Sequence, residues 1–306
     1  MDQGGGCSRW AAERHCRLRG SVSLHLPCRS MPGTLILCAT PIGNLGDLSE
    51  RAAKALAEAD VIFAEDTRRT GKLLNHIGAS VPMKSFFAHN ERARLNELSE
   101  FLDRGDTVVL VSDAGMPVVS DPGMSAVDVA ARAGATVTVI PGPSAVVTAV
   151  AVSGFEGDRF VFEGFLPRKG KARKAVIESI GEEQRTVVFF ASPGRVVKDL
   201  EQLAEHMASD RRVVLARELT KLHEEIWRGS IEKAVTHWQS VDNVRGEFTV
   251  VIEGAEAVAV DLGAASDAAK RLISQGSTTS DAVRQIAKSI GVSRRELYDL
   301  IVKDPA

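Results

Sequence analysis

The sequence predicts an α/β protein with two αβ domains, a cleft between them and a small helical segment at the C-terminus. From residue 34 to residue 154, apolar runs of strand length alternate with amphipathic helical patterns, which is typical of a mainly parallel sheet covered on both faces. From residue 155 to residue 254, strand-like and helical patterns mix less regularly and indicate a second, mixed sheet. Helical patterns follow a short polar link at residues 261–267. The 306 residues give enough length for two domains.

The first domain is expected over residues 33–154. Its expected strands read TLILCA, VIFAE, MKSFF, TVVLVS and TVTVI, and its expected helices cover residues 48–59, 91–104, 124–133 and 144–152. The segment between the second and third strands reads only as a polar stretch. Asp47 and Glu50 have the spacing of a capping box ahead of the first helix, so we expect Asp47 to be a helix cap and not a catalyst.

The second domain is expected over residues 155–260 and the helical segment over residues 261–306. The second domain has strand-like runs RFVFE, TVVFFA, RVVLA and FTVVIEG, and residues 223–229 alternate like a partly exposed strand. In the helical segment, one helix ends at Gly291, and a capping box of Ser293 and Glu296 begins the next. The apolar face of the earlier helix is formed by Val283, Ile286, Ala287 and Ile290.

The spacing of these two helices resembles a helix-turn-helix, which would contact nucleic acid. A plain structural cap is an equal alternative, because Lys and Arg outnumber Asp and Glu by only seven to five over residues 262–306.

Residues 1–32 differ in composition from the rest of the chain. They contain three consecutive glycines and several arginines, and their apolar pieces are interrupted by His and Pro where a secretory signal needs an unbroken run. We expect a disordered N-terminal extension upstream of a start at Met31. The four cysteines lack the spacing of a zinc site or a disulfide framework, which predicts no metal and a reducing, cytoplasmic location. They are Cys7, Cys16, Cys28 and Cys38.

Charge and hydropathy limit the partners. The formal net charge is −2, so any contact with RNA must come from a local basic patch. No apolar run approaches the length that spans a bilayer, so no membrane partner is expected.

Three Pro/Gly-rich turns follow three of the expected strands. They read TPIGNLGDL at Thr40–Leu48, VSDAGMPVVSDPG at Val111–Gly123 and IPGPSAV at Ile140–Val146. Because the carboxyl ends of parallel strands meet at one edge of a sheet, these turns predict a small-molecule pocket walled by main chain. None reads GxGxxG, and no GxxxxGK[ST] loop occurs, so an adenosyl ligand without phosphates fits better than a dinucleotide.

Five motifs together resemble the tetrapyrrole-methylase superfamily of S-adenosylmethionine-dependent enzymes. They are TPIGNLGDLS, AEDTR at Ala64–Arg68, FFAHNE at Phe86–Glu91, SDAGMPVVSDPG and IPGPSA, in this order and at matching spacings. The resemblance covers residues 33–254 and extends more weakly to the C-terminus. It implies the two-domain fold of that family and S-adenosylmethionine as cofactor. It further implies the activity of those members that methylate the 2′-oxygen of a cytidine in small-subunit (16S) ribosomal RNA.

The resemblance also implies where the cofactor lies. Asp113 and the backbone that follows it are expected to hold the amino-acid part, although an aspartate here could instead cap its own turn. The expected cofactor-binding residues are Ile42, Asp113, Ala114, Gly115, Met116, Ser144, Ala145 and Ala191.

Methyl transfer to a ribose hydroxyl is an in-line displacement, which needs alignment, exclusion of water and a general base. Candidate bases cluster after the second and third strands, with Arg68 and Asn90 as orienting groups. His89 and Asn90 have a structural alternative as a solvated loop and a helix N-cap. The candidate bases are Glu65, Asp66, His89 and Glu91, of which we name Glu65, Asp66 and His89 as the catalytic candidates.

A basic run in the second domain predicts a grip for RNA phosphates. Phe165–Ala175 carries five cationic side chains and no acid, although such a run is also typical of a solvated face. Arg217 and Lys221 either approach the reacting ribose or pair with nearby acids. The expected partners are small-subunit ribosomal RNA or the 30S particle, and a second copy of the chain in a homodimer. The expected RNA-binding residues are Arg68, Arg168, Lys169, Lys171, Arg217 and Lys221.

Two other functions stay open at this stage. The same fold could methylate a tetrapyrrole, since a fold does not fix a substrate, but AEDTRRTG and the basic run place charge where a macrocycle would need an apolar trough. A non-catalytic RNA-binding adaptor that uses the C-terminal helices is the second alternative, and it would not bind S-adenosylmethionine.

Overall fold

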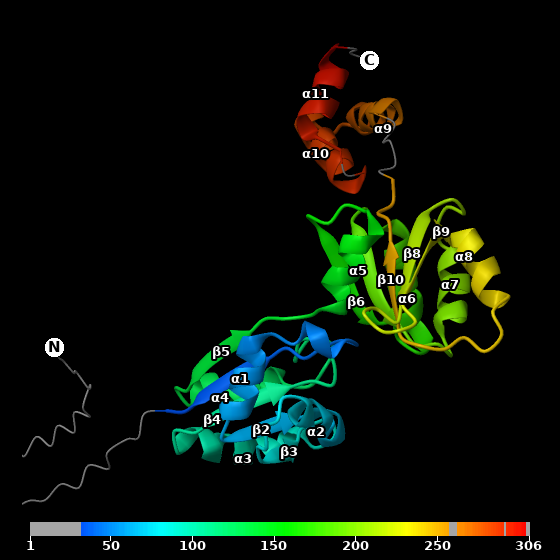
Figure 1. Ribbon diagram of the computed structural model, residues 1–306. Helices are drawn as coiled ribbons and strands as arrows, with labels where there is room; N and C mark the ends of the chain where they lie inside the picture. Colours follow the sequence, from blue (N-terminus) through cyan, green and yellow to red (C-terminus); the bar gives the residue numbers. More distant parts are fainter. Residues whose placement is uncertain (1–31, 257–261, 291, 304–306) are drawn as a thin grey trace, which may run out of the picture.

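The computed structural model describes residues 32–256, 262–290 and 292–303 of the chain (Figure 1). The expected N-terminal extension as far as Met31, with three of the cysteines, lies outside the described residues, as do Asp261 and Gly291. The polar link expected over residues 261–267 is wrong from residue 262 onward, because those residues already belong to a helix, α9 (Leu262–Ser274). Within the described residues, two five-stranded sheets and a group of C-terminal helices confirm the predicted α/β fold class.

The first sheet is entirely parallel, with strand order β3-β2-β4-β1-β5. Its strands are β1 (Thr34–Cys38), β2 (Val61–Ala64), β3 (Met83–Ser85), β4 (Thr107–Val111) and β5 (Thr136–Ile140). The helices beside it are α1 (Glu50–Glu58), α2 (Thr67–His76), α3 (Glu91–Asp103) and α4 (Met124–Arg132), and a 3₁₀ turn, η1 (Leu45–Asp47), precedes α1.

Helices cover both faces of the central strands of this sheet, as continuous apolar strands predict, whereas the edge strand β5 is mostly exposed. One core joins Leu56 of α1 and Leu73 of α2 to the strands, and the other joins Leu98 of α3 and Ala126 of α4 to the opposite face. Because β1 pairs in parallel with both β4 and β5, the carboxyl ends of these three strands lie at the same end of the sheet, where the three Pro/Gly-rich turns begin.

Two local expectations for this unit are wrong. Asp47 does not cap α1: it ends the 3₁₀ turn, and the Ser49 hydroxyl accepts a hydrogen bond from the Ala52 N–H at 3.1 Å. The segment expected as a polar stretch contains α2, which Asp66 caps at its N-terminus. Its few buried side chains explain why periodicity did not show it.

The second sheet is mixed, with order β6-β7-β10-β8-β9, and only β6 and β7 run parallel. Its strands are β6 (Phe160–Phe165), β7 (Thr186–Ala191), β8 (Arg212–Arg217), β9 (Glu225–Ser230) and β10 (Phe248–Ile252). One core, built around Phe189 and Trp238, joins the sheet to α6 (Gly170–Glu182), α7 (Val196–Ala204) and α8 (Ile231–Gln239).

The opposite face of the second sheet is covered by α5 (Ala145–Ser153), which follows the last strand of the first sheet (Figure 1). Val146 and Ala149 of α5 share a core with Val214 and Val251 of the second sheet. The third Pro/Gly turn therefore carries the chain from one sheet to the other.

The C-terminal helices α9 (Leu262–Ser274), α10 (Thr279–Ile290) and α11 (Arg294–Lys303) have a core of their own, in which Ala269, Val283 and Leu297 are buried. The Ser293 hydroxyl accepts from the Glu296 N–H at 3.4 Å, which confirms the expected start of the last helix. No helix in the described part of the chain is both long enough and apolar enough to cross a membrane.

Candidate functional site

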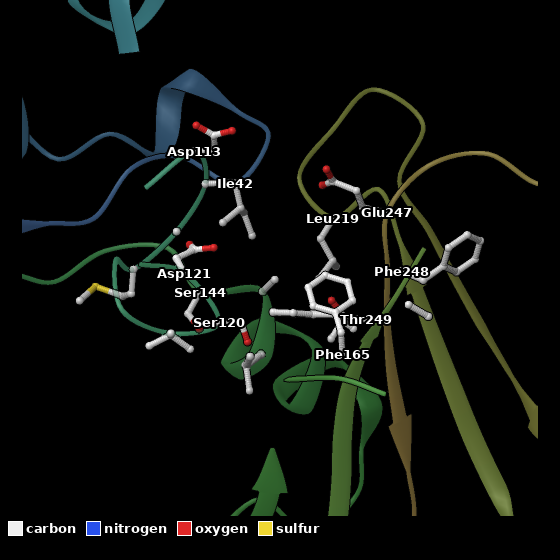
Figure 2. Close-up of a pocket in the computed structure, with 18 of the residues that line it drawn as sticks. Ile42, Asp113, Ser120, Asp121, Ser144, Phe165, Leu219, Glu247, Phe248 and Thr249 are labelled. Atoms are coloured by element: carbon white, nitrogen blue, oxygen red, sulfur yellow. The ribbon is translucent and has the colours of Figure 1, made fainter. Parts of the chain in front are cut away.

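A cavity of about 530 Å³ lies between the two sheets (Figure 2). One wall comes from the three turns at the edge of the first sheet, and the other from the ends of β6, β7, β8 and β10. All eight residues expected to bind the cofactor lie in this lining: Ile42, Asp113, Ala114, Gly115, Met116, Ser144, Ala145 and Ala191.

The turns of the first wall hold one another by main-chain hydrogen bonds. The Thr40 N–H donates to the Gly115 carbonyl at 2.9 Å, and the Gly115 N–H donates back to Thr40 at 3.1 Å. Gly115 has φ of +83°, a conformation that favours glycine. A side chain at Gly142 would approach the Ala39 methyl group to 2.8 Å. The wall is therefore fixed by backbone contacts and close packing.

The cavity is lined by more carboxylates than cations. Among the described lining residues, four are acidic and two are basic, so the formal charge of the wall is −2, and a cationic ligand suits it. The acidic residues are Glu65, Asp113, Asp121 and Glu247, and the basic ones are Arg69 and Lys221.

Asp113 is at the centre of the acidic group. Its carboxylate accepts from the Asp66 N–H at 2.9 Å and lies 3.5 Å from the Arg69 guanidinium, while its own N–H donates to Glu65 at 3.3 Å. Burial raises the pKa of Glu65. Burial, together with the negative charge of Glu65, raises the pKa of Asp121 to about 6. These carboxylates repel one another and favour a ligand that brings positive charge.

The loop after β8 closes the opposite side of the cavity. The Lys221 ammonium lies 2.8 Å from Glu218 and 2.9 Å from Glu247. Burial acts to raise the pKa of Glu218, but hydrogen bonds from Lys221 and from the Glu247 N–H lower it overall. A side chain at Gly43, in the first turn, would approach the Lys221 Cγ to 2.4 Å, so the two walls touch here.

Strained backbone is concentrated at the two loops beside the cavity. Val118 and Ser120 on one side, and Glu218 and Thr220 on the other, have φ between +51° and +76°. Non-glycine residues occupy this region at an energetic cost, and such strain clusters at functional sites.

The catalytic candidates separate in the structure. Glu65 lines the cavity, but Asp66 and His89 do not. The Asp66 carboxylate caps α2 and pairs with Arg68 at 2.7 Å, and the hydrogen bond from Arg68 lowers its pKa. His89 is exposed in the loop before α3, with its ring 6.4 Å from that of Phe87.

The two residues that follow His89 have structural partners. The Asn90 amide donates to the Ser85 carbonyl at 3.0 Å and its oxygen accepts from the Phe87 N–H at 2.8 Å, so its side chain does not cap the helix. Glu91 accepts from the Gly123 N–H at 3.2 Å and from the Ser125 hydroxyl, which ties α3 to the start of α4.

The basic residues expected to bind RNA lie in different surroundings. We call Pro167–Lys171, which ends in the first two residues of α6, the basic loop; its three cations, Arg168, Lys169 and Lys171, are exposed. Arg217 is held by Glu225 at 3.0 Å and by the Arg245 carbonyl, and Lys221 is clamped as described above. Arg68 is exposed beside Asp66.

A buried ion pair fixes the base of the basic loop. Arg173 is buried, lies 2.9 Å from Asp199 and donates to the Pro167 carbonyl at 3.1 Å. Arg195 donates to the Leu166 carbonyl at 2.9 Å. Arg173 therefore belongs to the structural support of the loop, and only part of the basic run faces solvent.

Sequence reasoning missed much of the second wall. Two missed residues of the first wall could have been found from the sequence. Asp121 is the second aspartate of the VSDAGMPVVSDPG turn, and Arg69 directly follows the expected site residue Arg68. Apart from Ala191 and Lys221, the wall from the second sheet had no signal in the sequence, because its residues are distant in sequence from the turns. The missed lining residues include Arg69, Val119, Ser120, Asp121, Phe165, Phe190, Leu219, Glu247, Phe248 and Thr249.

Comparison with known proteins defines the class first. The family model of the tetrapyrrole (corrin/porphyrin) methylases matches residues 34–235, from β1 to α8, so the chain belongs to this family. Two solved structures share the fold. They are a uroporphyrin-III C-methyltransferase from Thermus thermophilus (TM-score 0.53, 17% identity, 72% of this chain and 94% of that one) and a cobalt-precorrin-4 methyltransferase (TM-score 0.56, 16% identity, with 72% and 94% covered).

The names of relatives with similar sequences are more specific than the family, because they state a substrate. A protein from Thermotoga maritima named ribosomal RNA small subunit methyltransferase I is 49% identical over 224 residues, which are 73% of this chain and all of that protein. Relatives of the same name are 41% identical in Synechocystis (88% of this chain, 97% of that one) and 42% identical in Mycobacterium tuberculosis (89% and 95%). The chain is an S-adenosylmethionine-dependent methyltransferase.

The residues of the cavity fit this cofactor. Its volume suits a ligand of that size, and its acidic group suits a sulfonium and an ammonium. Apolar side chains such as Ile42, Val146 and Leu219 offer walls for an adenosyl group. Among the described residues, no group of three or more His, Cys, Asp or Glu side chains is arranged to hold a metal ion.

Proposed function

We propose that this protein transfers a methyl group from S-adenosylmethionine to the 2′-oxygen of a cytidine in 16S ribosomal RNA. The observation that carries the proposal is the match at 49% identity over the whole length of the Thermotoga relative named for small-subunit ribosomal RNA. The acidic cavity beside an exposed basic loop supports it, since the former suits a cationic methyl donor and the latter an anionic polymer.

The cavity residues have distinct tasks in this reaction. When bound, S-adenosylmethionine supplies an electrophilic methyl group on its sulfonium. Asp113 and the main chain of the second turn hold the ligand, and the apolar walls exclude water so that oxygen, carbon and sulfur stay in line. Glu65 is our candidate acceptor for the hydroxyl proton, because it lines the cavity and its raised pKa lies nearer neutrality than that of an ordinary carboxylate.

Asp66 and His89 are weaker candidates on this geometry. The Asp66 carboxylate is already engaged by Arg68 and the start of α2, and a lowered pKa makes it a poorer base. His89 would need RNA binding to bring the reacting hydroxyl to its exposed loop.

The other two functions have less support. The solved tetrapyrrole methyltransferases share the fold at only 16–17% identity, whereas the relatives at 41–49% identity are named for ribosomal RNA. A non-catalytic adaptor leaves the cofactor-sized acidic cavity without a role.

We further propose that the protein acts on the 30S particle, forms a homodimer and is located in the cytoplasm. The free edge of the first sheet supports the homodimer, because β5 carries the exposed apolar side chains of Val137 and Val139. Light scattering at micromolar concentration is expected to give the mass of two chains, and the mass of one chain would contradict the dimer.

The test of the activity compares substrates. Protein and radiolabelled S-adenosylmethionine are incubated with naked 16S RNA, with 30S particles that lack the modification, and with uroporphyrinogen III. We expect label in RNA, with the 30S particle as the better substrate. Label only in the tetrapyrrole, or in no substrate, would contradict the proposal.

A further inference from the structure

We propose that the ring of Phe165 is a stacking platform for an unpaired base of the RNA substrate at the mouth of the cavity. This inference rests on the proposed function, because it concerns how that substrate is held. Phe165 ends β6, lines the cavity and is 57% exposed (Figure 2).

An irregularity in β6 turns this ring toward the cavity. Phe162 pairs with Val188 and Phe165 with Phe190, so β6 advances three residues while β7 advances two. In a regular strand, residues three apart point to opposite faces, whereas a bulge changes that relation. The rings of Phe162 and Phe165 both lie against Phe190, with centroids 5.1 and 5.4 Å away.

Gly164 makes the bulge possible. It has φ of +59°, and a side chain there would approach the Ser120 hydroxyl of the facing loop to 3.2 Å. The ring of Phe165 therefore packs against Phe190, and its backbone follows the Gly164 bulge, while more than half of the residue stays exposed to solvent. A rigid, half-exposed ring gives a stacking surface at little further cost in conformational entropy.

Positively charged side chains that can bind phosphates follow Phe165 in the chain. The basic loop begins two residues after Phe165, and its three exposed cations project from a base fixed by Arg173 and Arg195. An aromatic ring beside cations that contact phosphates is the arrangement with which proteins hold single-stranded RNA.

The cofactor also has a base, but its adenine is a less suitable occupant. Phe165 is the most exposed aromatic side chain of the described lining, and it adjoins the basic loop. The cations of that loop suit RNA, which has phosphates, and not S-adenosylmethionine, which has none. The acidic group, which attracts the cationic part of the cofactor, is contributed largely by the opposite wall.

The test uses three variants of Phe165 and one control. Phe165→Ala removes the ring, Phe165→Leu keeps apolar packing without a ring, and Phe165→Trp keeps a ring. Phe87→Ala is the control, since Phe87 is a second exposed phenylalanine, 39% exposed, that does not line the cavity. Affinity for unmodified 30S particles is measured at several salt concentrations, and affinity for S-adenosylmethionine is measured by calorimetry.

We expect the Ala and Leu variants to bind the 30S particle about 5- to 150-fold more weakly, as loss of one stacked base predicts. Their salt dependence is expected to match that of the wild type, since a neutral ring releases no counterions. Affinity for S-adenosylmethionine is expected to stay within about twofold, and the Trp and control variants to bind RNA like the wild type.

Unchanged RNA affinity in both the Ala and Leu variants would overturn the inference. A loss of S-adenosylmethionine affinity without loss of RNA affinity would also overturn it and assign the ring to the adenine. Absence of methyl transfer by the wild-type protein would instead contradict the proposed function, so the two failures are distinguishable.

Discussion

Asp121 gives the cavity a pH dependence that can be calculated. Burial and the charge of Glu65 raise the pKa of its carboxyl to about 6, against an ordinary value of 3.8. In the unliganded protein this group is therefore largely protonated at pH 5 and largely ionised at pH 7. A cationic cofactor prefers the ionised form, so protons compete with it, and its affinity is expected to rise with pH.

The size of the effect follows from the pKa. With a value of about 6, the ionised fraction changes from about one tenth at pH 5 to about nine tenths at pH 7, so the apparent affinity for S-adenosylmethionine is expected to rise about tenfold, or ~1.4 kcal/mol. Glu65, whose pKa burial also raises, adds to the change at the acidic end.

Calorimetry at pH 5, 6 and 7 measures this dependence in the wild type and in Asp121→Asn. The variant is expected to lose most of the tenfold change, because its amide does not titrate, and to bind more weakly at pH 7. S-adenosylhomocysteine, which lacks the sulfonium charge, serves as a control ligand with a smaller expected pH dependence. A flat wild-type profile, or an equal tenfold change in the variant, would refute the reasoning.

Four further outcomes are expected. Asp113→Ala should weaken cofactor binding by about tenfold or more while the unfolding midpoint changes little, since a solvent-lined turn tolerates truncation; unchanged affinity would remove this residue from the site. Alanine at the three exposed cations of the basic loop should lower 30S affinity and reduce the slope of log affinity against log salt by about one unit per lost phosphate contact, with cofactor affinity unchanged; an unchanged slope would make the loop a solvated surface. Gly43→Ala should destabilise the protein by about 1–3 kcal/mol in urea unfolding, because its methyl group meets the facing loop, whereas Gly194→Ala, which has open space, should not; equal stabilities would contradict the close contact. Deletion after Leu262 should leave a folded, cofactor-binding protein with reduced methylation of 30S particles, because the C-terminal helices have their own core; full activity would make them accessory, and failure to fold would make them part of the main core.

Much of the first wall could be predicted because its information is local. Each Pro/Gly turn follows an apolar strand, and the parallel order of β1, β4 and β5 brings the turns to one edge. The same reasoning failed for α2, whose sequence is mostly polar, and for the cap of α1, where Ser49 lies two residues after the expected Asp47.

The second wall depends on long-range packing, which single-sequence patterns do not contain. Apolar residues lie on all sides of α5, so the sequence does not predict which face of the helix is buried or that this face covers the second sheet. For Lys221 the sequence leaves RNA binding and pairing with nearby acids open; the structure shows the pairing with Glu218, and the second partner, Glu247, is too distant in sequence for a local pattern to predict. Phe165 likewise depends on a bulge that alternation of side chains does not predict.

The most direct test of the central claim is to identify the methylated atom. After reaction with unmodified 30S particles, 16S RNA is digested to nucleosides and analysed by mass spectrometry against authentic standards. We expect 2′-O-methylcytidine, formed in proportion to the cofactor consumed and strongly reduced in the reaction of the Asp113→Ala variant at limiting cofactor. Methyl groups found only on a base carbon or nitrogen, or on the ribose of another nucleoside, would contradict the account.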